Sequence, residues 1–168
     1  MASSRCWAWA LSVSLLAGCA STGDASAPPT QALTVDAALT WPLAGEAGVD
    51  RLVTAVRQAM PAREMANPGR FASRDGVRLS DGYSLTFADI TPASHRVSLG
   101  VAKEACYPTE KAAKATGATA SPVVRDEHGV DVGQTYTVLS NGIRLRFTTT
   151  PAPYSCIDSI QIRKEAST

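Results

Sequence analysis

The sequence predicts an α+β domain with a mostly antiparallel sheet of about four to six strands, and with one long and one short helix packed on one face. Three observations predict this class. Apolar and polar residues alternate in several short segments after residue 82, as in strands with one buried face. An Asn-Gly pair joins two of these segments, and apolar residues recur at helical spacing between residues 46 and 60.

The first expected element is a long amphipathic helix. Ordered structure should begin near Val35, and residues 46–60 carry one apolar stripe, formed by Val49, Leu52, Val53, Val56 and Met60. Pro61 ends this helix, because proline cannot continue the hydrogen-bonded backbone. The following segment, 61–81, contains Asn67-Pro68-Gly69 and Asp75-Gly76 and is predicted to consist of turns and loop.

Two strands should follow. In the first, Tyr83, Leu85 and Phe87 alternate with smaller or polar residues, which predicts that these three share a buried face. The segment 97–101 repeats the pattern with two valines and a leucine. A helix beginning at Pro92 is the alternative for residues 92–102, because proline is favoured in the first turn of a helix.

A short helix and a hairpin come next. Residues 109–115 are rich in Ala, Lys and Glu, with Thr109 as a candidate N-terminal cap and Gly117 as the stop. Asn141-Gly142 suits the tight turn of a hairpin, because both residues tolerate positive φ angles. On its second strand Ile143, Leu145 and Phe147 share the core side, and Arg144, Arg146 and Thr148 share the solvent side.

The last strand is expected at residues 156–163. Cys156, Ile160 and Ile162 have the same parity there, so the thiol should point into the core with the two isoleucines. The preceding segment, 150–153, contains two prolines and is predicted to be a stiff, irregular loop.

The N-terminus has the pattern of an export signal. Arg5 precedes a short apolar run at residues 6–16, and small residues follow it in Leu16-Ala17-Gly18-Cys19. This segment resembles the lipobox of bacterial lipoproteins. The resemblance implies that residues 1–18 are a signal peptide and that Cys19 becomes the acylated first residue of the mature chain. A plain secretory signal with an incidental cysteine is the alternative.

Composition and length predict the organisation of the rest of the chain. Residues 19–34 are expected to be the lipidated cysteine and a flexible tether, because they are mostly Ser, Thr, Ala, Gly, Pro and Gln. Residues 35–165 are expected to form a single α+β domain. Palmitate-type acyl chains on Cys19 would hold the protein on the membrane. Ala20 and Ser21 lack the Asp that resembles an inner-membrane retention signal, which favours the periplasmic face of the outer membrane.

Two cysteines remain once Cys6 is removed and Cys19 is acylated. An exported chain with two leftover thiols usually oxidises them, so Cys106 and Cys156 are expected to form one disulfide between the short helix and the sheet. The alternative, a pair of free thiols that act as nucleophiles or metal ligands, lacks a CxxC spacing.

Charge and motifs argue against several classes of function. The formal net charge is +1 and the charges are scattered along the sequence, so nucleic acid is not an expected partner. A local patch of basic residues in the folded protein is the alternative. The sequence has no nucleophile elbow, HExxH motif or phosphate-binding loop, and we expect no enzyme activity and no cofactor. His95 should be an ordinary surface residue.

One acidic segment is a candidate metal site. Residues 126–131 place Asp126, His128 and Asp131 close together, and such side chains can bind a divalent cation. The segment lacks the ligand pattern of a calcium loop and contains Gly129, so a solvated turn is the expected structure and a metal is the weaker alternative.

Arg144 and Arg146 are the candidate partner-binding residues. They project to the same side of one strand, where they can hold a carboxylate-rich partner or simply keep the sheet surface soluble. We therefore expect a non-enzymatic binding module that docks on another envelope protein. An inhibitor or immunity lipoprotein that blocks a cell-wall hydrolase or toxin is one alternative, with the 67–81 or 150–153 loop entering a cleft. A small-ligand binder, which needs a groove, or a hydrolase is another.

Overall fold

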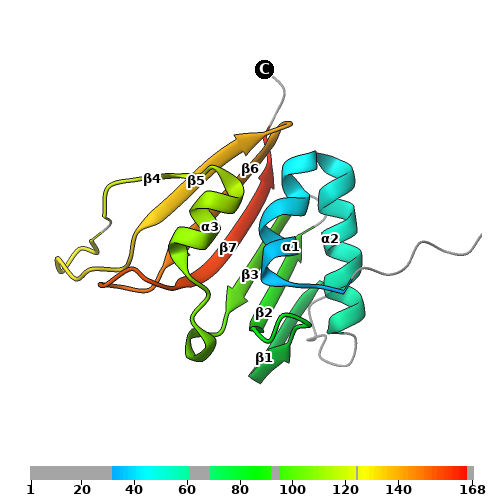
Figure 1. Cartoon of the computed structure of the whole chain (residues 1–168), viewed down its shortest axis with the longest axis horizontal. Helices are drawn as coiled ribbons and strands as arrows, with labels where there is room; N and C mark the ends of the chain where they lie inside the picture. Colours follow the sequence, from blue (N-terminus) through cyan, green and yellow to red (C-terminus); the bar gives the residue numbers. More distant parts are fainter. Residues whose placement is uncertain (1–31, 61–68, 92–94, 124, 166–168) are drawn as a thin grey trace, which may run out of the picture.

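The computed structural model describes residues 32–60, 69–91, 95–123 and 125–165. Within them seven antiparallel strands form one sheet, in the order β1-β2-β3-β7-β6-β5-β4 (Figure 1). The strands are β1 (Arg70–Arg78), β2 (Ser84–Thr91), β3 (Arg96–Val101), β4 (Thr119–Ala120), β5 (Thr135–Ser140), β6 (Ile143–Thr149) and β7 (Ile157–Lys164). The predicted fold class is confirmed, and the sheet has more strands than expected.

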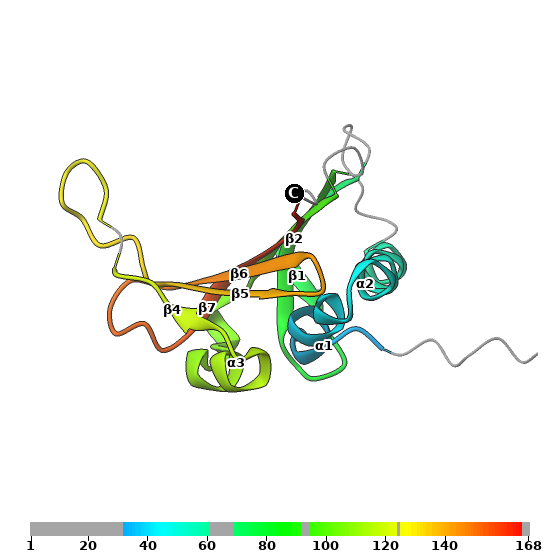
Figure 2. The same ribbon diagram turned by 90° about the horizontal axis from the view of Figure 1, so that it is seen from above.

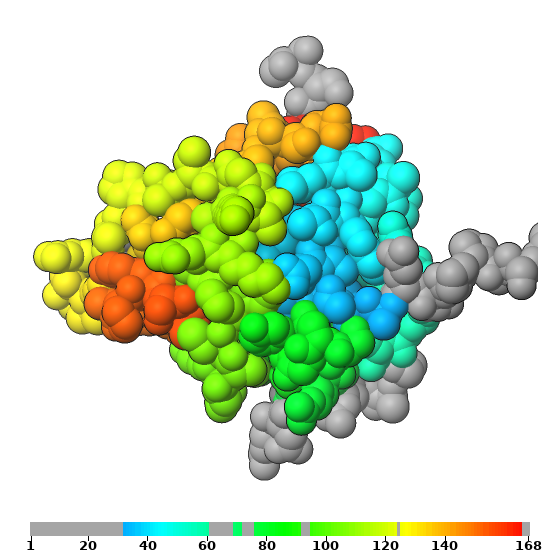
Figure 3. All heavy atoms as spheres, in the orientation of Figure 1, coloured from blue at the N-terminus to red at the C-terminus, as the bar shows by residue number. Residues whose placement is uncertain are grey.

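The helices of the described residues all lie on one face of the sheet (Figure 2). They are α1 (Val35–Thr40), α2 (Glu46–Ala59) and α3 (Thr109–Thr116), with short 3-10 turns η1 (Trp41–Ala44) and η4 (Lys103–Ala105). Figure 3, seen from the helix side, shows α1, α2 and α3 side by side over this face. No helix of the described residues lies on the opposite face of the sheet, which is called the open face below.

The hydrophobic core lies between the helices and the covered face. Leu39 of α1 and Leu52 and Val56 of α2 are completely buried there. They pack in one cluster with apolar residues of the central strands, namely Leu99, Leu145, Phe147, Ile160 and Ile162. Removing this apolar area from water is the main stabilising term of the fold.

Helix α1 was not predicted, and ordered structure begins slightly earlier than expected. Leu33 is buried, and the Thr34 hydroxyl caps α1 by accepting a hydrogen bond from the Ala37 amide at 2.8 Å. The predicted tether therefore ends before Leu33, since Leu33 and Thr34 belong to the folded domain. Residues 1–18, Cys19 and the tether up to residue 31 lie outside the described residues.

The loop predicted at residues 61–81 was wrong in its second half. Residues 61–68 lie outside the described residues, but residues 70–78 form the edge strand β1, which pairs with β2. The Asp75-Gly76 pair does not end the strand. It falls where the register shifts between Ala72 and Val77, and Gly76 has a φ of 72°. The turn signal thus belongs to a bulge within a strand.

A second bulge overturns the prediction for Phe87. The register of β2 against β3 shifts between Leu85 and Phe87. Leu85 and Ala88 are buried, whereas Phe87 is 40% exposed. The extra residue moves the Phe87 side chain to the open face, because an irregularity of one residue reverses the faces of a strand.

Of the two structures expected for residues 92–102, a strand or a helix, the strand is present as β3. Val97, Leu99 and Val101 are buried there, as the alternation predicted. Residues 92–94 lie outside the described residues. The helix predicted at 46–60 is confirmed as α2, and the one at 109–115 as α3.

The hairpin is confirmed, with two details of the neighbouring segments corrected. Asn141 and Gly142 join β5 and β6 with φ angles of 48° and 73°.

Thr109 is not the cap of α3 but its first helical residue, and its buried hydroxyl donates to the Tyr154 carbonyl oxygen at 2.7 Å. The strand β7 begins at Ile157, which is buried where Cys156 was expected, because the register against β6 shifts beside Thr149.

Candidate binding site on the open face

Four arginines gather on the open face of the sheet. Arg144 and Arg146 lie on β6, Arg163 lies on β7 and Arg96 lies at the start of β3. They line a depression of about 540 Å³ together with Thr137 and Gln161. We call this depression the arginine groove.

The strand register places three of these arginines in one row. Arg163 pairs directly with Arg96 on one side and with Arg144 on the other. Arg146 lies in the next row, opposite Gln161 and Thr137. Directly opposed like charges destabilise an antiparallel sheet, so this row costs stability unless negative charge compensates it.

Glu165 supplies compensating negative charge. A carboxylate oxygen of Glu165, which follows β7, lies 2.9 Å from Arg144 Nε and 4.0 Å from Arg163 Nε. The Glu165 amide donates to the Gly142 carbonyl oxygen at 2.9 Å, which fixes the backbone beside the hairpin turn. The same carboxylate oxygen, Oε1, is buried but makes no well-aligned hydrogen bond. It is held by charge and not by directed bonding.

Asp89 supplies a carboxylate farther along the sheet. Asp89 of β2 pairs with Arg70 of β1 at 3.8 Å. Arg146 instead donates from Nη2 to the Thr135 hydroxyl at 3.2 Å. Among the described residues the groove therefore holds four guanidinium groups and one carboxylate, and its chemistry is that of an anion-binding surface.

The structure confirms the predicted placement of Arg144 and Arg146 and adds two residues. Both predicted side chains are exposed and lie on the face away from the core. Arg96 and Arg163 were missed. Arg163 has the opposite parity to Ile160 and Ile162, and this pattern was enough to place it on the face away from the core. Only the strand order shows that Arg163 lies beside Arg144 and Arg96.

The predicted metal candidates serve as a hydrogen-bonded turn. Asp126 accepts from the amides of His128 at 2.9 Å and Val130 at 2.8 Å. Asp131 accepts from the Tyr154 hydroxyl and from the Gly133 amide, and these two hydrogen bonds lower the pKa of the Asp131 carboxyl. No group of three potential ligands converges within the described residues.

The predicted disulfide between Cys106 and Cys156 is present. It joins the segment before α3 to the segment before β7, with the Cα atoms 4.9 Å apart. The alternative of two free thiols is thereby wrong. His95 is exposed, as expected, at the start of the β3 segment.

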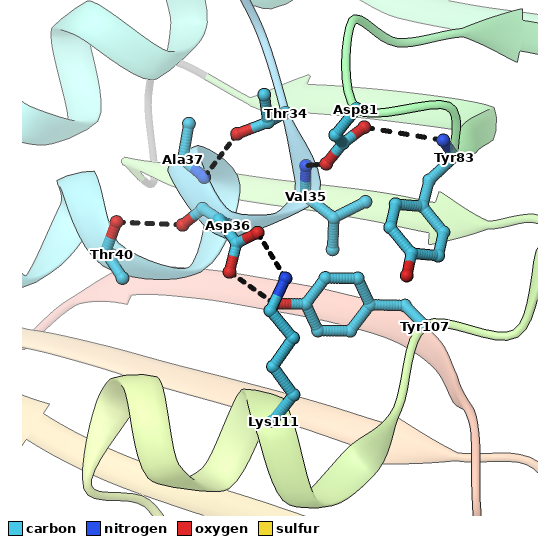
Figure 4. Close-up of polar contacts among 9 residues, drawn as sticks. All are labelled: Thr34, Val35, Asp36, Ala37, Thr40, Asp81, Tyr83, Tyr107 and Lys111. Atoms are coloured by element: carbon cyan, nitrogen blue, oxygen red, sulfur yellow. Dashed lines mark hydrogen bonds and ion pairs between the residues drawn. The ribbon is translucent and has the colours of Figure 1, made fainter.

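A second polar cluster lies on the helix side, where α1 meets α3 (Figure 4). Asp36 accepts a hydrogen bond from the Tyr107 hydroxyl and one from Lys111 Nζ, each at 2.6 Å. Asp81 accepts from the Val35 amide at 2.8 Å. These contacts fasten the start of the domain to α3 and to the β1-β2 turn, which is a structural role.

Tyr107 and Asp36 affect one another electrostatically. Burial, and then the neighbouring Asp36 carboxylate, raise the pKa of the Tyr107 hydroxyl well above its ordinary value. Burial would by itself raise the pKa of Asp36, but the hydrogen bonds from Lys111 and Tyr107 and the charge of Lys111 lower it overall. The tyrosine therefore stays a neutral donor and Asp36 an anionic acceptor.

Comparison with known proteins gives no relative. No protein-family profile, curated protein or solved structure matches the chain. In the part of the chain that the structure describes, none of the helices has the length and apolar character needed to cross a bilayer.

Proposed function

We propose that this protein is a non-enzymatic, lipid-anchored module of the bacterial cell envelope that docks on another envelope protein through its open face. The observation that carries the proposal is the arginine groove, in which four arginines of three strands share one uncovered surface. Their planar donors suit carboxylates, which they bind with two parallel hydrogen bonds. An acidic surface of a partner fits this chemistry.

The proposed location rests on the N-terminal sequence. The Leu16-Ala17-Gly18-Cys19 pattern favours acylation of Cys19, and Ala20 and Ser21 favour the periplasmic face of the outer membrane. A tether of roughly ten residues or more spans on the order of 20 Å as a flexible chain. A tether of this length leaves the domain free to turn its open face toward a protein in the periplasm or in the membrane.

Site-specific crosslinking in cells tests this proposal. A photocrosslinking amino acid at Thr137, in the groove, should capture a reproducible protein partner. The same amino acid at Lys114, exposed on α3 over the opposite face, should not capture that partner. The double variant Arg144→Glu/Arg146→Glu should lose most of the crosslink from Thr137. An undiminished crosslink in the double variant would contradict docking through the groove.

One further observation favours an inhibitor as the second candidate. The segment between β4 and β5 projects from the sheet edge (Figure 2) and carries three exposed valines, Val123, Val130 and Val132. A projecting apolar loop can enter the cleft of a hydrolase or toxin. In that case replacing the three valines by serine should abolish inhibition, while the double arginine variant should retain it.

A further inference from the structure

The arginine row is an unfavourable arrangement that the fold maintains. Arg96, Arg163 and Arg144 are directly opposed on three neighbouring strands, and neighbouring strands lie about 4.8 Å apart. Polar uncharged residues at these positions would keep the surface soluble without like-charge repulsion. An unfavourable charge cluster on an uncovered face indicates a site for a ligand of opposite charge.

Glu165 shows which ligand chemistry the row accepts. Its Oε1 atom is removed from solvent between Arg144 and Arg163, at 2.9 Å and 4.0 Å from their Nε atoms. The side chain as a whole is 26% exposed. A carboxylate from the chain itself therefore already lies in the position where a carboxylate from a partner would pair with these two arginines.

The contact of Glu165 is also one that a better-placed carboxylate can replace. Its buried oxygen lacks an aligned hydrogen bond, whereas a carboxylate approaching an arginine side-on can form two. Arg146 donates to a neutral hydroxyl, and Arg96 has no carboxylate within ion-pair distance among the described residues. A ligand with several carboxylates can engage these two arginines as well.

We propose that the arginine groove binds a short acidic peptide segment of the partner, and that Glu165 is an internal occupant which a carboxylate of that segment displaces. This inference rests on the proposed docking function and specifies the chemistry of the partner. Binding then exchanges one carboxylate for another at Arg144 and Arg163 and adds new pairs at Arg96 and Arg146. Glu165 lowers the affinity for weakly acidic segments and so raises selectivity for segments with several carboxylates.

The observations favour a peptide over a polyphosphate such as nucleic acid. The net charge of the chain is only +1, so no broad positive field surrounds the groove. The groove is also hollow and includes Thr137 and Gln161, whose side chains can hydrogen-bond a peptide backbone.

Fluorescence anisotropy on the full-length protein in detergent micelles tests the inference. The probe is a labelled peptide of alternating Glu and Ser, and its control replaces every Glu by Gln. Glu165→Gln should bind the acidic peptide about tenfold more tightly than the unchanged protein, because the negative charge that competes for Arg144 and Arg163 is removed. Glu165→Asp keeps the charge but shortens the side chain by one methylene, and it should also tighten binding.

Asp89→Asn is the matched control for charge. It removes one carboxylate from the same face, away from the row, and should change the affinity less than about threefold, as expected of a surface charge. Thermal melts establish that each variant is folded, and Glu165→Asp supplies the test if Glu165→Gln is not. Single-stranded DNA serves as the polyanion control and should bind more weakly than the acidic peptide.

The outcomes separate this inference from the proposed function. If the acidic peptide binds and the Glu165 variants are no tighter than Asp89→Asn, the displacement of Glu165 is contradicted while docking through the groove stands. Equal binding of the Gln peptide or tighter binding of DNA would overturn the assignment of an acidic peptide. Failure of docking itself is read from the cellular crosslink at Thr137, which does not depend on Glu165 being displaced.

Discussion

Asp36 connects three segments that are far apart in the sequence. Its carboxylate accepts from Tyr107, which follows the disulfide cysteine, and from Lys111 of α3, while its backbone belongs to α1 (Figure 4). The side chain is 42% exposed, so solvent screens part of the attraction to Lys111. The contribution of this cluster to stability is therefore moderate and depends on the protonation of one group.

We predict that Asp36→Asn lowers the free energy of unfolding by about 1 kcal/mol at pH 7. The pKa of Asp36 is lowered in the folded state by the Lys111 and Tyr107 hydrogen bonds, which outweigh the opposing effect of burial. A lowered pKa stabilises the fold above the unfolded-state pKa of about 3.9, and this stabilisation disappears as the pH falls through the folded-state value.

Urea denaturation at pH 7 and pH 3 measures this effect. The difference between Asp36→Asn and the unchanged protein should shrink at pH 3, because the carboxyl of the unfolded chain binds a proton below its pKa of about 3.9 and the stabilisation then decreases. Asp50→Asn, at an exposed position of α2, is the control and should have little effect at either pH. A difference for Asp36→Asn that stays constant between the two pH values would contradict an ionic role.

At the scale of elements, the close approach of α2 and the η1 turn depends on a missing side chain. Gly48 lies in the first turns of α2 and is buried. A Cβ atom at this position would lie 1.8 Å from the Trp41 carbonyl oxygen and 2.7 Å from its carbonyl carbon. Both neighbours are backbone atoms of η1, so they cannot rotate away as a side chain could.

Gly48→Ala should therefore destabilise the protein by about 2 kcal/mol, as overpacking does in other cores. Helix propensity taken separately gives the opposite sign, since alanine stabilises a helix interior by about 1 kcal/mol relative to glycine. A thermal melt of the variant distinguishes the two effects. Ala47→Gly, at the exposed neighbouring position, should cost less than about 1 kcal/mol, and a melting temperature raised by Gly48→Ala would show that the turn can move away.

The elements that the sequence predicted correctly are those with strong local signals. Helix α2 has a long apolar stripe and a following proline, and the β5-β6 hairpin has an Asn-Gly turn between two alternating strands. The strand β1 was missed because Asp75-Gly76 forms a bulge, and the face of Phe87 was wrong for the same kind of reason. A single sequence does not distinguish a bulge from a turn, because both need the same backbone freedom.

Two of the four arginines of the groove were predicted from the sequence, and the other two depend on the strand order of the whole sheet. Arg144 and Arg146 are two residues apart on one strand, so their shared face follows from the period of a strand. Arg96 and Arg163 join them only because β7 lies between β3 and β6. Strand order is a long-range property, and the sequence carries no local record of it.

The disulfide links the segment before α3 to the segment before β7. Cys106 and Cys156 are 50 residues apart, and the loop that they close contains α3, β4, β5 and β6. Arg144 and Arg146 lie within this loop, whereas Arg96 and Arg163 lie outside it. The arginine groove therefore has residues both inside and outside the loop that the disulfide closes.

We predict that the double variant Cys106→Ala/Cys156→Ala is less stable by about 4 kcal/mol, because a loop of this length gains conformational entropy in the unfolded state. For a domain of this size the melting temperature should fall by about 15 °C. A reducing agent should lower the melting temperature of the unchanged protein by a similar amount and should leave the double variant unaffected. Equal melting temperatures with and without reductant would contradict a stabilising disulfide. Well below its melting temperature, the double variant should still bind the acidic peptide. Binding should weaken only if the pairing between β6 and β7 is lost.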